Sequence, residues 1–294
     1  MAQITLDEIN GMDRGRFVET LGDIFEHAPW VAEVTYDARP FADLSALYEA
    51  MTAGVRDAAA GRQMAFIKQH PDLAEPAREG AMTDDSKYEQ SSAGLDRLSD
   101  QEYATFHRLN DAYKAKFGFP FIVCVRRHGK ESILRQFERR LSNDVPDEQR
   151  TALNEIFRIV ALRLDQRVMA TDRLKVHGRL TTHVLDTHRG QPASGVAIEL
   201  AEIGLSGTTR LILRAKTNAD GRTDRPLIAE QPIPIARYEL RFGIGDYFTE
   251  HGASTVDPPF LDVIPIRFSV AEPEAHYHVP LIVTPWSYST YRGS

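Results

Sequence analysis

The hydrophobic pattern of this 294-residue chain changes its period once, between about residues 170 and 178. After this point, short runs such as LTTHVLD and VAIELAEI alternate apolar with polar residues, and turn-forming stretches separate them. Before it, apolar side chains recur at the spacing of an amphipathic helix, as at Leu44, Leu47, Tyr48 and Met51. We therefore predict two domains, an all-α domain over residues 1–170 and an all-β sandwich or barrel over residues 178–294.

Local signals predict where several helices begin and end. Thr5 with Glu8, and Ser99 with Glu102, have the spacing of a capping box, in which each side chain bonds the other residue's backbone N–H. Gly118 is suited to end the second of these helices, because glycine tolerates the left-handed conformation found at many helix ends.

Two residues of the first half are candidates for a functional site. His70 precedes Pro71, which disfavours the α conformation of its predecessor, so a helix should end there and leave the imidazole either solvated or facing a cleft. Arg163 falls on the apolar stripe of a helix predicted from about Asp147 to Met169. Snorkelling to solvent is the commoner explanation for such an arginine, and a carboxylate partner is the alternative.

A polar segment and an apolar segment lie between His70 and Arg163 in the sequence. SKYEQSSAGL is either a helix entry with side-chain caps or a polar cradle of side chains and free backbone N–H groups. GFPFIVCV places Cys124, the single cysteine, in apolar surroundings, which favours an inert buried thiol and excludes a disulfide within the chain. Arg126, Arg127 and Lys130 follow as a charge cluster that we expect to be solvated.

Composition narrows the class of partner. The net charge of −7 and the pI near 5.8 lack the basic footprint of a nucleic-acid-binding protein, so small molecules are the expected partners. No window approaches the ~18 apolar residues of a membrane span. The first residues lack the basic and apolar regions of a secretory signal, and we therefore expect a cytoplasmic protein with no membrane partner.

Histidines mark two of the predicted strands. Alternation in LTTHVLD puts Thr181, His183 and Leu185 on one face of their strand, and His276 and His278 share a face of a later one. Strand histidines are more often structural than catalytic. Because no His or carboxylate stands at a strong ligand spacing such as HExxH, we predict no metal site.

Three motifs of the second half, LTTHVLDTHRGQPASGV, TNADGRTD and HYHVPLIVTPWSYSTYRGS, occur in the order found in a known family. Over Leu180 to Ser294 the chain resembles 5-hydroxyisourate hydrolase, the enzyme branch of the transthyretin-like family. The resemblance implies a transthyretin-like sandwich that assembles as a tetramer with active sites between subunits. It also implies a catalytic set of His183, Arg222 and His278, and a substrate site lined by Tyr291, Arg292, Gly293 and Ser294.

The reaction implied is hydrolytic opening of 5-hydroxyisourate at its N1–C6 amide bond, which gives 2-oxo-4-hydroxy-4-carboxy-5-ureidoimidazoline (OHCU). A neutral imidazole with a pKa near ~6.5 can deprotonate a water for this purpose. Arg222 would hold the oxyanion or lower the pKa of a neighbouring histidine. Which of the two histidines is the base stays open.

The first half, over about Leu6 to Met169, resembles OHCU decarboxylase, which consumes that product. HPDLA, SKYEQSSAGL, FGFPFIVCV and the arginine-bearing last helix carry the resemblance. It implies His70 and Glu89 as the catalytic pair and Arg163 as the anion contact, with Arg158 or Arg167 as alternatives. It also implies a substrate cradle formed by Pro71, Ser86, Gln90, Phe119, Phe121, Ile122 and Val123.

Together the two resemblances imply a bifunctional enzyme without a cofactor that converts 5-hydroxyisourate through OHCU into (S)-allantoin. A homo-oligomer is expected, tetrameric through the second half and with a dimer contact through the first. Two alternatives remain. The chain could be a transthyretin-like carrier of a small ligand with a helical scaffold, or only one of its halves could be active.

Overall fold

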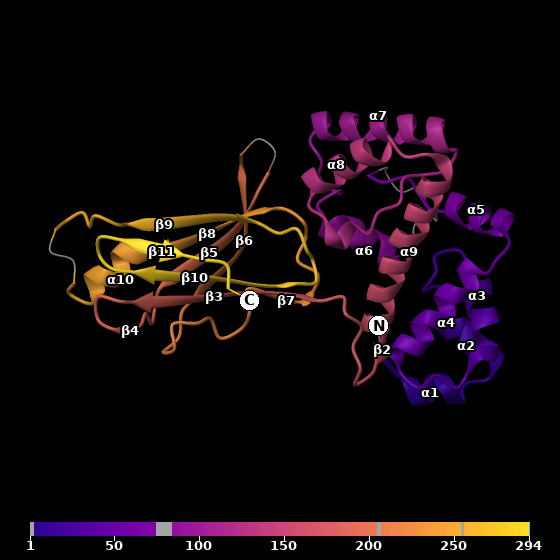
Figure 1. The fold of residues 1–294 in the computed structure, drawn as a ribbon, viewed down its shortest axis with the longest axis horizontal. Helices are drawn as coiled ribbons and strands as arrows, with labels where there is room; N and C mark the ends of the chain where they lie inside the picture. The colour runs from indigo at the N-terminus through magenta and orange to yellow at the C-terminus, as the bar shows by residue number, and fades with distance from the viewer. Residues whose placement is uncertain (1–2, 75–83, 205–206, 254–255, 294) are drawn as a thin grey trace. The chain divides into compact units, whose positions relative to one another are not determined.

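The computed structural model describes residues 3–74, 84–204, 207–253 and 256–293. Its contacts divide the chain into two compact units, Met1–Arg126 with Ser132–Val176, and Arg127–Glu131 with His177–Ser294. The first is helical and the second consists mainly of two β-sheets, so the predicted fold class, an all-α region followed by an all-β sandwich, is confirmed (Figure 1).

The helical unit contains short and long helices joined by tight turns. None of the described helices is both long and apolar enough to cross a membrane. A short parallel pair, β1 (Ile4–Thr5) with β2 (Val168–Met169), joins the two ends of the unit. Its other elements are α1 (Leu6–Gly11), α2 (Arg14–Leu21), α3 (Pro29–Thr35), η1 (Tyr36–Ala38), α4 (Leu44–Arg56), α5 (Ala60–Lys68), α6 (Asp84–Ser92), α7 (Asp100–Phe117), η2 (Val125–Arg127), α8 (Lys130–Arg140) and α9 (Val145–Arg167). The last residue of η2 and the first two residues of α8 group with the second unit.

Both predicted capping boxes are present. At α1, Thr5 N donates to Glu8 Oε2 at 2.8 Å, and Glu8 N donates back to Thr5 Oγ1 at 3.2 Å. Ser99 and Glu102 repeat the exchange at the start of α7. Gly118 ends α7 with a φ of 74°, the left-handed conformation that its lack of a Cβ permits.

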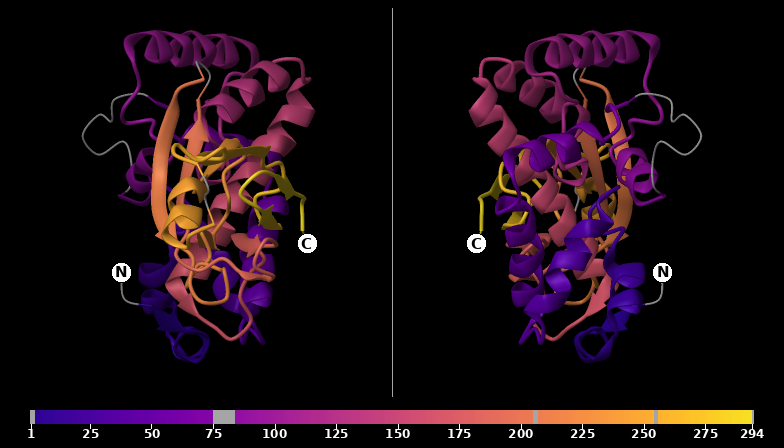
Figure 2. Two further views of the ribbon diagram at one scale, coloured as in Figure 1. Left: turned by 90° about the vertical axis from the view of Figure 1, so that its left-hand side faces the viewer. Right: turned by 90° about the vertical axis from the view of Figure 1, so that its right-hand side faces the viewer.

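The long helix α9 forms the centre of the helical core. Helices α4 and α5 pack against it, and α7 crosses near its N-terminal end (Figures 1 and 2). At that crossing Tyr113 of α7 and the buried Arg140 of α8 both donate to Glu148 of α9, the arginine from Nε at 2.7 Å. The buried carboxylate is therefore neutralised and hydrogen-bonded where the helices meet, as burial of a charge requires.

The second unit is a sandwich of two sheets (Figure 1). One sheet has the order β11-β10-β3-β4, with β7 also paired to β3, and the other has the order β6-β5-β8-β9. The strands are β3 (Gly178–Asp186), β4 (Gln191–Pro192), β5 (Ala197–Ile203), β6 (Thr209–Lys216), β7 (Ile228–Gln231), β8 (Arg237–Gly243), β9 (Val263–Ser269), β10 (His276–Val283) and β11 (Tyr288–Thr290).

Alternation along β3 decides which side chains enter the sandwich core. Leu180 and Val184 are fully buried among residues of the other sheet, such as Leu200 and Leu240. The opposite face of β3, with Thr181 and His183, is only partly buried. The predicted alternation is confirmed, and it leaves the histidine face free of the core.

One helix of this unit, α10 (Ile244–Glu250), is not expected from the alternating pattern. It packs Tyr247 into the core, where the phenol donates to the buried carboxylate of Asp186 at 3.0 Å. Arg127 is also held within this unit, because its Nε donates to Glu274 at 2.7 Å. The expectation that Arg127 is solvated was therefore wrong.

Candidate active sites

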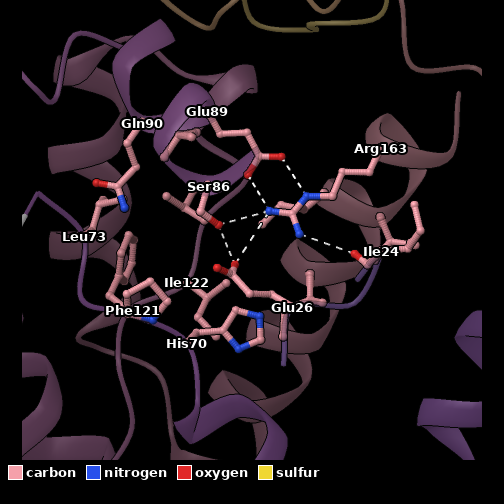
Figure 3. Close-up of a pocket in the computed structure, with 16 residues that line it drawn as sticks. Ile24, Glu26, His70, Leu73, Ser86, Glu89, Gln90, Phe121, Ile122 and Arg163 are labelled. Carbon is pink, nitrogen blue, oxygen red and sulfur yellow. Dashed lines mark hydrogen bonds and ion pairs between the residues drawn. The ribbon is translucent and has the colours of Figure 1, made fainter. Parts of the chain in front are cut away.

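The first candidate site is a cavity of about 50 Å³ within the helical unit (Figure 3). Its walls come from the turn after α2, the residues that follow α5, one face of α6, the apolar run before η2, and α9. The lining is polar on one side and apolar on the other. It consists of Ile24, Glu26, His70, Pro71, Leu73, Ser86, Glu89, Gln90, Phe121, Ile122, Val123, Val125, Ile156, Ile159, Val160 and Arg163.

Arg163 organises the polar side of this cavity. The side chain is 5% exposed, and its Nε and Nη2 donate to the two carboxylate oxygens of Glu89, each at 2.9 Å. Nη2 also donates to Ser86 Oγ at 3.1 Å, and that hydroxyl donates to Glu26 Oε2 at 2.5 Å (Figure 3). Two buried carboxylates thus lie against one guanidinium, the arrangement in which paired charges tolerate burial.

His70 lies just beyond the end of α5, as Pro71 predicts. Its Nδ1 is 3.2 Å from the carbonyl oxygen of Phe66. Because a carbonyl oxygen can only accept, Nδ1 carries the proton and Nε2 of the neutral ring is the proton acceptor. Burial lowers the pKa of His70 to about 4, although the negative charge of Glu26 opposes the change. The imidazole is therefore neutral near pH 7.

Two opposing effects act on the pKa of the Glu89 carboxyl group. Burial raises the pKa of its carboxyl group, while the hydrogen bonds and charge of Arg163 act to lower it. The cavity thus combines a cation, a carboxyl group whose proton affinity is increased, and a neutral imidazole against an apolar wall. Such surroundings strengthen electrostatic interactions with a small anionic ligand, because little water is present to screen them.

The cavity brings together most of the residues predicted for it. His70, Glu89 and Arg163 line it, as do Pro71, Ser86, Gln90, Phe121, Ile122 and Val123. Phe119 is an exception: it does not line the cavity, and its ring packs against Tyr113 with centroids 5.8 Å apart, in the aromatic cluster beside α7.

The two alternatives to Arg163 point elsewhere. Arg158 is about half exposed and pairs with Glu155 on its own helix. Arg167 pairs with Asp23 and Asp85. The arginine of α9 that lines the cavity is therefore Arg163.

Sequence reasoning missed Glu26. It lies in the turn after α2, where no motif marks it, and it is only 4% exposed. The available signal was a carboxylate within an apolar run, because Ile24, Phe25 and Ala28 around it are all fully buried. A charged residue in such a run needs a buried partner.

The second candidate site lies on β3 and β10. These strands pair in parallel, with His278 beside Thr181 and Pro280 beside His183. Residues in register on neighbouring strands face the same way, so the two predicted histidine faces form one surface. Thr181 Oγ1 lies 2.9 Å from both His276 Nε2 and His278 Nδ1. The hydroxyl thereby fixes the orientation of both rings.

Arg222 reaches this surface from the turn between β6 and β7. A bridge in the backbone pairs it with His183. Burial first, and then the positive charge of Arg222, lower the pKa of both His183 and His278. Within the described residues, the buried Nε2 of His183 has no hydrogen-bond partner. A ligand or water is thus required to satisfy it.

The end of the chain returns to the same surface. Gly293 N donates to the carbonyl oxygen of His278 at 2.9 Å. A Cβ on Gly293 would lie only 2.8 Å from His278 Cδ2, so a glycine is needed for this close approach.

The other predicted residues of this end differ in what they contact. Tyr291 is 57% exposed, and Arg292 places its guanidinium over the ring of Tyr277, 4.7 Å from the centroid. Ser294 lies outside the described residues. Among the residues that are described, no group of three or more His, Cys, Asp or Glu side chains is arranged to hold a metal ion.

Comparison with known proteins connects both halves of the chain to catalysed reactions. Over residues 10–165 the chain matches the family model described as OHCU decarboxylase, and over residues 180–293 that of the HIUase/transthyretin family. It is 42% identical over 172 residues to a 2-oxo-4-hydroxy-4-carboxy-5-ureidoimidazoline decarboxylase of Halalkalicoccus jeotgali, an alignment covering 58% of this chain and 96% of that protein.

The second half has equally clear relatives. It is 55% identical over 119 residues to a 5-hydroxyisourate hydrolase of Deinococcus radiodurans, which covers 40% of this chain and 98% of the relative. Over nearly the whole chain, the crystal structure of an (S)-allantoin synthase is similar, with 33% identity and a TM-score of 0.50, covering 99% of this chain and all of that one. The chain therefore belongs to the OHCU decarboxylase family through its helical half and to the HIUase/transthyretin family through its β-sheet half.

Proposed function

We propose that the surface around His183 and His278 performs a hydrolysis whose product is decarboxylated in the cavity around His70. The chain is a bifunctional enzyme of urate degradation: it hydrolyses 5-hydroxyisourate to OHCU and decarboxylates OHCU to (S)-allantoin. One observation best supports the assignment of decarboxylation to the helical half. The Arg163–Glu89 pair lies in one cavity with a neutral His70, and a carboxylate substrate requires a cation and a proton carrier.

For the hydrolysis, His183 and His278 are the candidate bases. Their lowered pKa values keep both imidazoles neutral near pH 7, so either one can take a proton from water. The nucleophile then adds to the C6 carbonyl, the N1–C6 bond breaks, and N1 receives the proton. Arg222 would stabilise the negative charge that develops on the carbonyl oxygen.

For the decarboxylation, Arg163 would bind the substrate carboxylate before it leaves as CO₂. Its Nη1 is the nitrogen freest to turn to substrate, because its bond to the Ile24 carbonyl is long, at 3.4 Å. When the C–C bond breaks, the electron pair is delocalised into the imidazoline ring. His70 would accept the proton of the substrate's hydroxyl group at Nε2 and then deliver it to one face of the ring, and Glu89 would hold Arg163 in place. Water supplies the further proton that replaces the released CO₂.

The carrier alternative is less well supported. A site for an apolar ligand has no need for two histidines with lowered pKa values beside an arginine. The site on β3 and β10 is also open, with Arg222 and Tyr291 exposed, which fits a tetramer in which a partner subunit completes it. We propose this tetramer, a further dimer contact through the helical half, and a cytoplasmic location.

Separate inactivation of the two sites tests the proposal. 5-Hydroxyisourate is generated from urate with urate oxidase, and ultraviolet absorbance and circular dichroism are followed after addition of each variant. His70→Asn should slow decarboxylation by roughly 10²–10⁴-fold, leave hydrolysis intact and let OHCU accumulate. His278→Asn should slow hydrolysis and leave decarboxylation of OHCU unchanged. If either variant affected both steps equally, or neither, the division of labour would be wrong.

A further inference from the structure

A second cavity in the helical unit has no part in either reaction described so far. Its volume is about 170 Å³, larger than the 50 Å³ of the cavity around His70. The two cavities share Arg163 and Glu89 as a common wall. The second is lined by Asp85, Tyr88, Glu89, Arg126, Arg163, Gln166 and Arg167.

Arg126 is the unusual member of this lining. It is only 9% exposed, so the expectation that it belongs to a solvated cluster was wrong. Within the described part of the chain, its guanidinium makes no hydrogen bond or ion pair. Arg163 and Arg167, by contrast, are paired with Glu89 and with Asp85. Burial of an unpaired cation is costly, so a buried guanidinium that borders a cavity favours an anion there.

The charges around the cavity agree with this. Three arginines line it together with the carboxylates of Asp85 and Glu89. Two further carboxylates, Asp23 beside Arg167 and Glu26 beside Arg163, lie outside the lining. The lining therefore carries a net charge of about +1 near pH 7. A planar guanidinium matches two oxygens of an oxyanion. Tyr88, at 59% exposure, and the exposed Gln166 border an opening to solvent.

We propose that this cavity binds a small oxyanion through Arg126, and that its occupancy slows decarboxylation through the shared wall. The positive charge of Arg126 acts on the Glu89 carboxyl group and lowers its pKa, against the larger effect of burial. An anion on Arg126 cancels that charge next to the carboxylate that holds Arg163 in place. Bicarbonate, the hydrated form of the CO₂ that decarboxylation releases, and inorganic phosphate share the required chemistry.

Binding is tested first on the full-length protein by equilibrium dialysis with radiolabelled sulfate at constant ionic strength. We expect one saturable site per chain that is weakened at least about tenfold in Arg126→Gln, while the matched variant Arg108→Gln, an exposed arginine of α7, binds as the wild type does. Competition by bicarbonate or by phosphate then identifies the source. Absence of saturable binding in the wild type, or equal binding by Arg126→Gln, would overturn the proposal.

Three further measurements test the proposal. Far-ultraviolet circular dichroism checks that Arg126→Gln folds, and Arg126→Lys, which keeps the charge without the planar fork, should bind sulfate with intermediate affinity. In activity assays, saturating sulfate should lower kcat for decarboxylation severalfold with little change in KM, and leave hydrolysis unaffected. Arg126→Gln should not respond. Sulfate that raised only KM would be binding in the substrate cavity, and sulfate that bound through Arg126 without an effect on kcat would disprove the coupling.

Discussion

The two candidate sites hold neutral, proton-accepting histidines in different surroundings, one enclosed and one open. In the helical half, His70 lies among charged groups that are 4–7% exposed, and burial, with a lesser contribution from the charge of Arg163, lowers its pKa to about 4. On the β-sheet half, His183 and His278 are only partly buried. Burial is still the main cause of their lowered pKa values, and the charge of Arg222 adds to it. A buried site depends on every charge being paired, whereas an open one depends on strand register.

This difference predicts where each site is fragile. Removing a charge from a buried network leaves its partner unpaired, which costs stability as well as activity. Removing a charge from an open surface changes activity but hardly affects stability, because water replaces the lost partner. The next three predictions test the contrast, from the largest expected effect to the smallest.

Arg163→Met should have the largest effect. The substitution removes the cation that pairs with the buried carboxylates of Glu89 and Glu26. We expect the stability of the helical half to fall by about 3–5 kcal/mol and the decarboxylase activity to be lost. Urea unfolding followed by circular dichroism measures the change. The matched variant Arg150→Met removes an exposed ion pair with Asp147 on the same helix and should cost less than about 1 kcal/mol. Equal costs would show that burial does not govern this site.

Arg222→Gln should affect the open site through its pH dependence. Without the positive charge, the pKa values of His183 and His278 rise towards their usual range, so both rings become protonated at a higher pH. The acid limb of hydrolysis should therefore move to higher pH, with a fall in kcat of roughly 10²-fold and unchanged stability. The pH profile of kcat measures this. Arg225→Gln, an exposed arginine of the same turn, is the control, and a profile unchanged by Arg222→Gln would refute the electrostatic role.

Gly293→Ala should have the smallest effect and acts through geometry alone. The added Cβ must displace the chain end or the His278 ring by several tenths of an ångström, and we expect hydrolysis to slow roughly tenfold while decarboxylation is unchanged. Steady-state rates of both steps show the difference. Gly243→Ala serves as control, since its Cβ would meet its nearest neighbour at 3.6 Å, an ordinary contact. Full hydrolytic activity of Gly293→Ala would mean that the chain end does not position His278.

Sequence reasoning succeeded where the interacting residues are close in the sequence and failed where they are far apart. The capping pairs at Thr5 and Ser99 were predictable, because their partners lie three residues away. The placement of His70 at a helix end followed from its neighbour Pro71. Glu26 was missed, and Arg126 was wrongly expected to be solvated, because their surroundings are supplied by residues far away in the sequence, such as Ser86 and Arg163.

The sequence by itself determined the change from helices to strands, the faces of β3 and β10, and the families to which the two halves belong, because periodicity and motifs are properties of neighbouring residues. Only the tertiary structure decided which charges are paired. Packing brings Glu89, Arg163 and Glu26 together across α6, α9 and the turn after α2, and excludes Phe119 from the cavity they line. The energy of a buried charge depends on these distant partners, and no local pattern specifies them.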